Sequence, residues 1–176
     1  MNVLALCGSL RAASVNRMLL EACRRVAPPH TLTVLDGLGA LPLFNPDLEA
    51  DLPTPVRALH AEIERTDALL IASPEYAHGV TGVLKNALDW LVSFPPFVDR
   101  PVAIFNASPR SVHADAALRE ILTTMSAHLV VDACLALPLR STGPTVESIA
   151  AGHGAAMRAA LESLARAMRG AAVEEC

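Results

Sequence analysis

The chain has 176 residues, enough for one well-buried domain and too few for two ordinary ones. Hydrophobic residues make up 52% of the sequence, which excludes a disordered chain, and no apolar stretch reaches the roughly 18–20 residues of a membrane-spanning helix. A net charge of −4, no basic run and an aromatic content of 3% argue against a nucleic-acid partner.

The start of the chain and its cysteines indicate the compartment. The N-terminus lacks the basic segment and the apolar core of a signal peptide, so we expect a cytoplasmic protein. Cys7, Cys23, Cys134 and Cys176 form no CxxC pair and no metal-like spacing with histidine. We therefore expect reduced thiols and no bound metal.

Five short apolar runs alternate with helical patterns along the chain. The predicted strands are residues 3–7, 31–35, 67–72, 101–106 and 129–137, the last interrupted by Asp132. The predicted helices are residues 14–26, 56–65, 81–91, 114–127 and, after Thr145, a last one to about 168. Residues 36–55 are rich in Gly, Pro, Asn and Asp and predict a long loop, which is often functional in a compact domain.

This alternation predicts an α/β fold with helices on both faces of a parallel sheet. The element lengths suit a flavodoxin-like, doubly wound, five-stranded sheet with strand order 2-1-3-4-5. We expect one domain over residues 1–170 and a frayed tail over 171–176. In such sheets ligands bind beyond the C-terminal strand ends, which selects the loops at residues 8–14, 73–80 and 107–113.

The first of these loops places polar groups at the start of a helix. A helix N-terminus has unpaired N–H groups and a partial positive charge, so a loop that enters it from a strand can bind an anion. The hydrogen-bonding side chains and the cation here are Ser9, Arg11, Ser14 and Asn16, after a Gly8 that permits a turn. The alternative is a plain helix cap, with Ser14 as the cap and Arg11 in solvent.

Other phosphate motifs are excluded by their spacing. The sequence contains neither GxxxxGK[ST], the P-loop pattern, nor GxGxxG, the dinucleotide pattern. A thiol phosphatase motif CxxxxxR counted from Cys7 would need an arginine where the chain has Ala13.

GSLRAASVN at residues 8–16 and SPEYAHGVTGVLKNALDWL at 73–91 resemble the NADPH-dependent FMN reductase family. This flavodoxin-like group includes bacterial quinone, azo-dye and chromate reductases, and its marks are GSxRxxSxN and PEYxxxxxxxLKNAxDWL. LPLFNPDLE at residues 41–49 is similar to the family's second loop. The resemblance implies an enzyme that binds FMN, takes a hydride from NADPH or NADH, and forms a homodimer or homotetramer.

The resemblance also assigns binding residues by position. It implies that the FMN phosphate is held by Ser9, Arg11, Ser14 and Asn16, with Val15 among them in the cofactor-binding set. It implies that Pro74, Glu75 and Tyr76 line the isoalloxazine and that Gly79 lets the chain pass close to the ring. For residues 74–79 an ordinary strand-to-helix turn is the alternative.

The loop after the fourth strand departs from the family. The family often has a glycine-rich SxGxxGG stretch, whereas this chain has SPRSVHA at residues 108–114. We keep Ser108 and Arg110 in the cofactor-binding set, with Arg110 either a cation near the pyrimidine end of the ring or a solvated side chain. We expect His78 and His113 to be bystanders at the pocket rim rather than proton donors.

The helix after the third strand carries the family's remaining polar residues. Lys85 and Asp89 can pair at i,i+4, and Asn86 can tie down the flavin loop. Leu84, Leu88 and Leu91 are expected in the core, and Trp90 in the core or an interface. For self-association, the side chains expected to form exposed apolar patches are Leu43, Phe44, Trp90, Phe94 and Phe97.

The resulting hypothesis is an FMN-dependent NAD(P)H oxidoreductase with ping-pong kinetics. Its acceptor is a small molecule such as a quinone, an azo compound, free flavin or a metal oxyanion, and no side chain is assigned a catalytic role because the flavin supplies the chemistry. The alternatives are a flavodoxin-like electron carrier and a non-redox module that binds another phosphate ligand.

Overall fold

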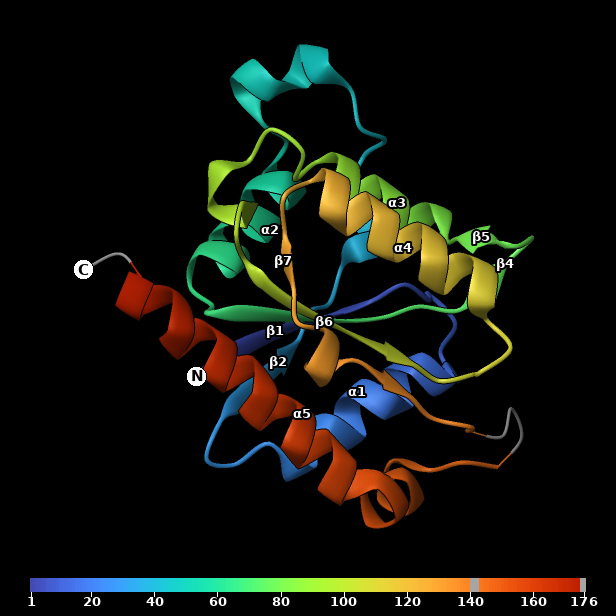
Figure 1. Cartoon of the computed structure of the whole chain (residues 1–176). Coiled ribbons are helices and arrows are strands. Elements are labelled where there is room, and N and C mark those ends of the chain that lie inside the picture. Colours follow the sequence, from blue (N-terminus) through green and yellow to red (C-terminus); the bar gives the residue numbers. More distant parts are fainter. Residues whose placement is uncertain (140–142, 175–176) are drawn as a thin grey trace.

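The computed structural model describes residues 1–139 and 143–174, with side chains up to residue 169. Its main sheet is parallel, with the order β2-β1-β3-β6-β7, and β8 also pairs with β6 (Figure 1). The predicted strand order 2-1-3-4-5 is confirmed, with β6 as the fourth strand. The strands are β1 (Asn2–Cys7), β2 (Thr31–Val34), β3 (Ala68–Ala72), β6 (Pro101–Asn106), β7 (His128–Leu129) and β8 (Leu135–Ala136).

Helices cover both faces of the sheet, as predicted (Figure 1). Successive strand residues point to opposite faces, so Val3 and Ala5 join one hydrophobic cluster while Leu4 and Leu6 join the other. The first cluster lies under α1 and α5, and the second lies under α2, α3 and α4. The helices are α1 (Val15–Val26), α2 (Thr54–Glu64), α3 (Gly82–Asp89), α4 (Val112–Thr124) and α5 (Val146–Glu174).

The fifth strand is not continuous, so the prediction of one strand over 129–137 is wrong in detail. After β7 the chain makes a 3-10 turn, η4 (Val131–Ala133), and returns to β6 as β8. The interrupting Asp132 lies exposed in that turn. Leu137 N–H then bonds the Asn106 carbonyl at 2.8 Å, which leads the chain past the C-terminal end of β6.

The loop after β3 contains a small antiparallel hairpin that the sequence pattern did not predict. Its strands are β4 (Glu75–Tyr76) and β5 (Gly79–Val80). The two turn residues between them, Ala77 and His78, have φ values of 49° and 58°. Two-residue hairpin turns of this kind usually contain Asn-Gly or Asp-Gly, so the Ala-His sequence did not indicate a hairpin here.

The long loop after β2 is confirmed and contains two 3-10 turns, η1 (Leu38–Ala40) and η2 (Pro46–Asp51). Asn86 of α3 ties down this loop and not the flavin loop for which it was predicted. Its Nδ2 donates to the Pro42 carbonyl at 2.9 Å, and its Oδ1 accepts from Phe44 N–H at 2.8 Å. The Lys85–Asp89 pair forms, with 2.5 Å between Nζ and Oδ1.

The prediction of an exposed apolar patch is wrong for two of its members. Trp90 and Phe97, the latter in the 3-10 turn η3 (Pro95–Phe97), are each only 1% exposed. Trp90 stacks edge-to-face on Phe44 and its Nε1–H donates to the Pro42 carbonyl at 2.8 Å. It is therefore a core anchor, whereas Leu43 is 83% exposed.

The last helix continues to Glu174, past the predicted end near residue 168. Of the tail expected to fray, residues 175–176 lie outside the described residues. Within the described ranges, no helix combines the length and the apolar content needed to cross a bilayer.

Candidate functional site

The loops after β1, β3 and β6 meet at one cavity of about 200 Å³ beyond the C-terminal strand ends. This is the edge at which parallel α/β sheets bind ligands. The structure brings together six of the predicted site residues in its lining, whereas Ser9, Arg11, Ser14, Tyr76 and Gly79 lie outside it. The lining consists of Val15, Asn16, Ser73, Pro74, Glu75, Asn106, Ala107, Ser108, Arg110, Ser111 and Leu139.

The first loop caps α1 and leaves one buried polar atom without a partner. Ser14 is 3% exposed, and its Oγ accepts from Arg17 N–H at 3.3 Å, so Ser14 caps α1, as both interpretations of this loop allow. Asn16 is 7% exposed and lines the cavity, but its Oδ1 has no hydrogen-bond partner among the described residues. Because buried polar groups are nearly always paired, this oxygen calls for a hydrogen-bond donor from a bound ligand or a water molecule.

Gly8 allows the loop after β1 to pack closely against the loop after β3, a role beyond the turn expected from the sequence. A Cβ at this position would lie 2.2 Å from Ser73 Oγ and 3.0 Å from Thr81 Oγ1. The Gly8 carbonyl accepts from Thr81 Oγ1 at 2.7 Å, which fixes the first loop to the start of α3. The glycine therefore holds the two ligand-facing loops in close contact.

The hairpin after β3 is attached to α4 by a carboxylate. Glu75 Oε2 accepts from Ala114 N–H at 2.9 Å, within the first turn of that helix, where a negative charge is favourable. Tyr76 is 57% exposed. A Cβ at Gly79 would make only an ordinary contact, 3.7 Å from the Tyr76 carbonyl, so the protein itself does not crowd this position.

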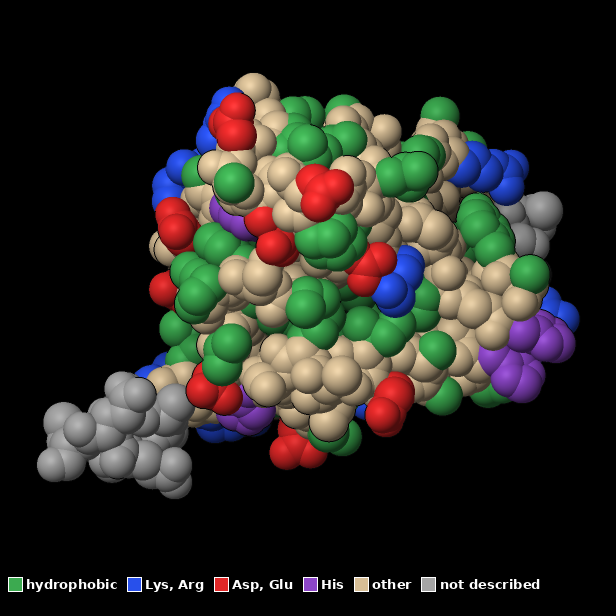
Figure 2. Space-filling model, turned by 90° about the horizontal axis from the view of Figure 1, so that it is seen from above, with side chains coloured by type: hydrophobic (Ala, Val, Ile, Leu, Met, Phe, Trp, Pro, Cys, Tyr) green, Lys and Arg blue, Asp and Glu red, His purple; other side chains and the backbone are tan. Residues whose placement is uncertain are grey.

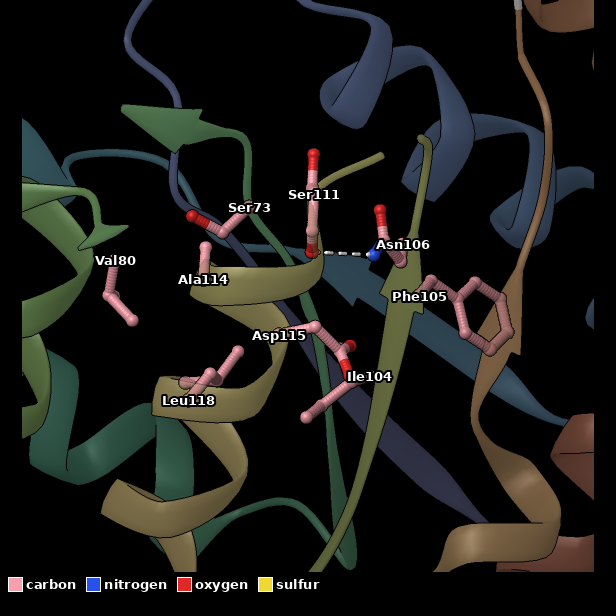
Figure 3. A pocket seen from close by; sticks show the side chains of 9 residues that line it. All are labelled: Ser73, Val80, Ile104, Phe105, Asn106, Ser111, Ala114, Asp115 and Leu118. Atoms are coloured by element: carbon pink, nitrogen blue, oxygen red, sulfur yellow. Dashed lines mark hydrogen bonds between the residues drawn. The ribbon is translucent and has the colours of Figure 1, made fainter. Parts of the chain in front are cut away.

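The loop after β6 is organised by Asn106, which the sequence analysis did not select. Its Oδ1 accepts from Ser108 N–H at 2.9 Å, and its Nδ2 donates to the Ser111 carbonyl at 3.2 Å (Figure 3). These two bonds shape a loop that lacks the family's glycines. A polar residue at the end of a buried parallel strand is the signal that could have identified it.

A second, much smaller cavity lies beside this loop. It measures about 10 Å³, room for a single water molecule, and the side chains of Ser73, Asn106 and Asp115 border it together with apolar residues (Figure 3). It shares Ser73, Asn106 and Ser111 with the larger cavity.

Charges of both signs lie at this site: Arg110 and Glu75 line the larger cavity, and Arg11 lies on the first loop outside the lining. Arg11 and Arg110 are exposed, and neither forms an ion pair within the part of the chain that the structure describes. Arg17, by contrast, forms an ion pair with Asp36, with 2.7 Å between its guanidinium nitrogen and Oδ1. Burial raises the pKa of the Cys7 thiol at the end of β1, so this side chain stays neutral beneath the first loop.

The fold and the position of this cavity define a flavodoxin-like α/β protein. A flavoenzyme NAD(P)H:(acceptor) oxidoreductase from Paracoccus denitrificans has a similar solved structure, with a TM-score of 0.75 over 96% of this chain and 97% of that one. Its sequence is 23% identical, so this likeness concerns the fold alone.

Sequence comparison places the chain more narrowly. The family model for NADPH-dependent FMN reductases matches residues 1–141. An NAD(P)H-dependent FMN reductase of Pseudomonas aeruginosa is 37% identical over 132 residues, which are 72% of this chain and 71% of that protein. The quinone reductase of Escherichia coli K12 is 35% identical over 61% of this chain and 60% of its own length. The chain belongs to the NADPH-dependent FMN reductase family, an oxidoreductase family that uses FMN with NAD(P)H.

The residues at the cavity fit FMN. The unpaired Oδ1 of Asn16 needs a donor, which the ribityl hydroxyls of FMN can supply, while the amide Nδ2 can donate to phosphate. The N–H groups in the first turn of α1, close to Arg11, suit a phosphate dianion.

Proposed function

We propose that this protein oxidises NAD(P)H and reduces a small-molecule acceptor with FMN bound in the cavity at the C-terminal strand ends. The single observation that carries the proposal is the buried, unpaired Oδ1 of Asn16, a residue that lines that cavity at the start of α1. Family membership favours an enzyme over an electron carrier or a regulatory module.

We assign the phosphate end of FMN to the first loop. Arg11 supplies a guanidinium, the hydroxyls of Ser9 and Ser14 supply donors, and the backbone N–H groups of Val15 and Asn16 belong to the unpaired first turn of α1. Ser9 Oγ lies 3.4 Å from Arg11 N, so the loop is already folded into a compact turn. A preformed turn loses little conformational freedom when the anion binds.

We assign the ring end to the other two loops. Pro74 and Glu75 from one loop, and Ser108 and Arg110 from the other, border the cavity, with Tyr76 and Gly79 beside it on the hairpin. Arg110 places a positive charge where a reduced ring is expected to carry negative charge. The Glu75–Ala114 bond keeps the hairpin and α4 in fixed relation to each other.

When bound, FMN accepts a hydride from NAD(P)H and passes it to the acceptor. The protein positions the nucleotide and the acceptor in turn at one cavity, so we expect ping-pong kinetics. No side chain of this chain is assigned as a nucleophile or proton donor. Quinones are the acceptor class that the names of several relatives suggest, with azo compounds, free flavin and metal oxyanions as further candidates.

The test is an activity assay joined to a flavin assay. The purified protein should be yellow, and it should oxidise NADPH or NADH with a quinone, giving parallel lines in double-reciprocal plots at several quinone concentrations. Arg11→Glu should lose its flavin on gel filtration, whereas the control Arg158→Glu, an exposed arginine on α5, should retain it. A flavin-loaded protein without turnover on any acceptor would favour the electron carrier.

We also propose that the protein is a homodimer or homotetramer. Leu10 and Leu43 are 68% and 83% exposed, and a Cβ at Gly39 would lie 2.9 Å from the Leu10 side chain, so the first loop and the long loop present apolar groups near each other. A cytoplasmic location remains a prediction from the sequence.

A further inference from the structure

Two histidine rings from different elements stack on each other next to the proposed flavin site. His78 lies in the turn between β4 and β5, and His113 lies in the first turn of α4. Their ring centroids are 4.3 Å apart, their planes differ by 20°, and both residues are exposed. In Figure 2, histidine side chains gather beside a Lys or Arg side chain at the right edge, the side on which Figure 1 shows the β4–β5 hairpin.

The backbone holds this pair in place. His78 and its neighbour Ala77 both have positive φ, a conformation that residues other than glycine rarely adopt. The Glu75–Ala114 hydrogen bond fixes the hairpin to the helix that carries His113. Unusual backbone that the surrounding structure enforces is concentrated at ligand sites, so this turn is a candidate for one.

The charged and titratable groups around the pair nearly cancel. On the hairpin these groups are Glu75 and Tyr76. Arg110 precedes α4, and Asp115 on α4 pairs with Arg119 at 2.7 Å between Oδ2 and Nε. Arg110 thus offsets Glu75, and Arg119 offsets Asp115. The surface around the two imidazoles therefore carries no excess of negative charge that would repel a phosphate.

We propose that His78 and His113 form a subsite for a phosphate monoester, the ribose 2′-phosphate that distinguishes NADPH from NADH. This inference rests on the proposed function, because it concerns the co-substrate of the same cavity. A phosphate monoester carries close to two negative charges at neutral pH and offers three acceptor oxygens. Each imidazole ring has an N–H group that can donate a hydrogen bond to one of these oxygens.

The alternative is that the histidine pair binds the pyrophosphate of the nucleotide, which NADH and NADPH share. Its two groups are diesters, and their charge does not change between pH 5 and 8. Binding of the pyrophosphate would therefore give no selectivity between the nucleotides, and the test separates the two cases.

The kinetic test compares both nucleotides in the flavin-loaded enzyme with one quinone. The double variant His78→Gln/His113→Gln should raise the KM for NADPH about ten-fold and leave the KM for NADH within about two-fold, with kcat for NADH unchanged. The control is His128→Gln, an exposed histidine whose strand register with Pro101 places it at the opposite end of β6 from the cavity.

A binding measurement makes the result independent of turnover. Calorimetry with 2′,5′-ADP and with 5′-AMP isolates the 2′-phosphate, and the double variant should lose about ten-fold in affinity for 2′,5′-ADP only. Equal losses for both ligands, or no loss for either, would overturn the subsite. If the wild type turned over neither nucleotide, the proposed function would fail, and the calorimetry would still decide whether this pair binds the phosphate.

Discussion

At the scale of single residues, Asn16 distinguishes a ligand site from a plain helix start. The Oγ of nearby Ser14 has a partner within the protein, because it accepts from Arg17 N–H and caps α1. Asn16 is equally buried but leaves its Oδ1 unpaired, which costs about 1–3 kcal/mol when no ligand or water supplies a donor. A flavin that supplies this donor would therefore stabilise the folded protein beyond its packing.

Replacing Asn16 separates binding from stability. Asn16→Leu removes the unpaired group at similar volume, so the flavin-free protein should be as stable as the wild type or more stable by about 1 kcal/mol. FMN affinity should fall about ten-fold or more. Urea denaturation with and without FMN measures both quantities. A variant that is strongly destabilised without flavin yet binds FMN normally would assign Asn16 to structure alone.

The buried thiol of Cys23 gives a pH dependence of stability. Burial raises the pKa of this thiol from its ordinary value near 9 to about 12. Between these values the unfolded chain has lost the proton and the native protein keeps it, so stability falls as pH rises, by about 1.4 kcal/mol per pH unit. Cys23→Ala should flatten the slope above pH 9 in denaturation experiments, and Cys134→Ala serves as the thiol control. An unchanged slope in Cys23→Ala would reject this account.

At the scale of elements, the segment of α3 and its C-cap Trp90 position the long loop through the Pro42 carbonyl, in addition to the bond from Phe44 N–H to Asn86 Oδ1. The Pro42 carbonyl accepts from both Asn86 Nδ2 and Trp90 Nε1, at 2.9 and 2.8 Å. Both donors come from the LKNALDW motif, so this motif holds the long loop after β2 in place. It does not contribute to the cavity lining itself.

This shared carbonyl predicts a coupling between two variants. Trp90→Phe removes one donor and leaves the carbonyl paired, at a cost of about 1 kcal/mol. In the background of Asn86→Leu the same change leaves the carbonyl with no donor, so its cost should rise by about 1 kcal/mol or more. A double-mutant cycle of unfolding free energies measures this term, and simple additivity would show that the two bonds act independently.

The sequence pattern predicted the central strands, because their burial on both faces is visible as apolar runs. It did not predict features that depend on how strands pair with each other. Runs such as VLALC and ALLIA are apolar on both faces and could only be central strands. The break between β7 and β8 arises because β7 pairs with the first half of β6 and β8 with its second half. The β4–β5 hairpin depends on an Ala-His turn in which both residues have positive φ. Neither is encoded in local hydrophobicity.

The site was likewise predicted in part, because its loops follow from the topology whereas some of its residues depend on contacts between distant segments. Topology alone selected the three loops, and the structure brings Asn16, Glu75 and Arg110 together at one cavity. Asn106 was missed because its role is to shape a loop through two hydrogen bonds, which depends on where that loop returns. The His78–His113 stack was missed for a similar reason, since it joins two elements 35 positions apart.

At the scale of the whole molecule, hydrophobic clusters on both faces of the sheet support the loops at the C-terminal ends of its strands. The loops beyond the strand ends carry exposed apolar side chains that include Leu10, Leu43 and Tyr76. Such groups close to a ligand site are suited to contact with a second copy of the chain.

Sedimentation velocity tests this association. The flavin-loaded protein should sediment as a dimer or tetramer at micromolar concentration, and Leu43→Glu should shift it toward the monomer. Val98→Glu, which replaces an exposed valine in the turn before β6, is the matched control. A wild type that is monomeric at this concentration would contradict the proposal.

The most direct test of the central claim compares the affinities of the flavin-free protein for FMN and for riboflavin, which lacks only the phosphate. If the loop after β1 binds that phosphate, FMN should bind about a hundred-fold more tightly or better, and Arg11→Ala should remove much of the difference. Equal affinities for the two flavins would contradict the account, because the first loop would then contribute nothing to recognition.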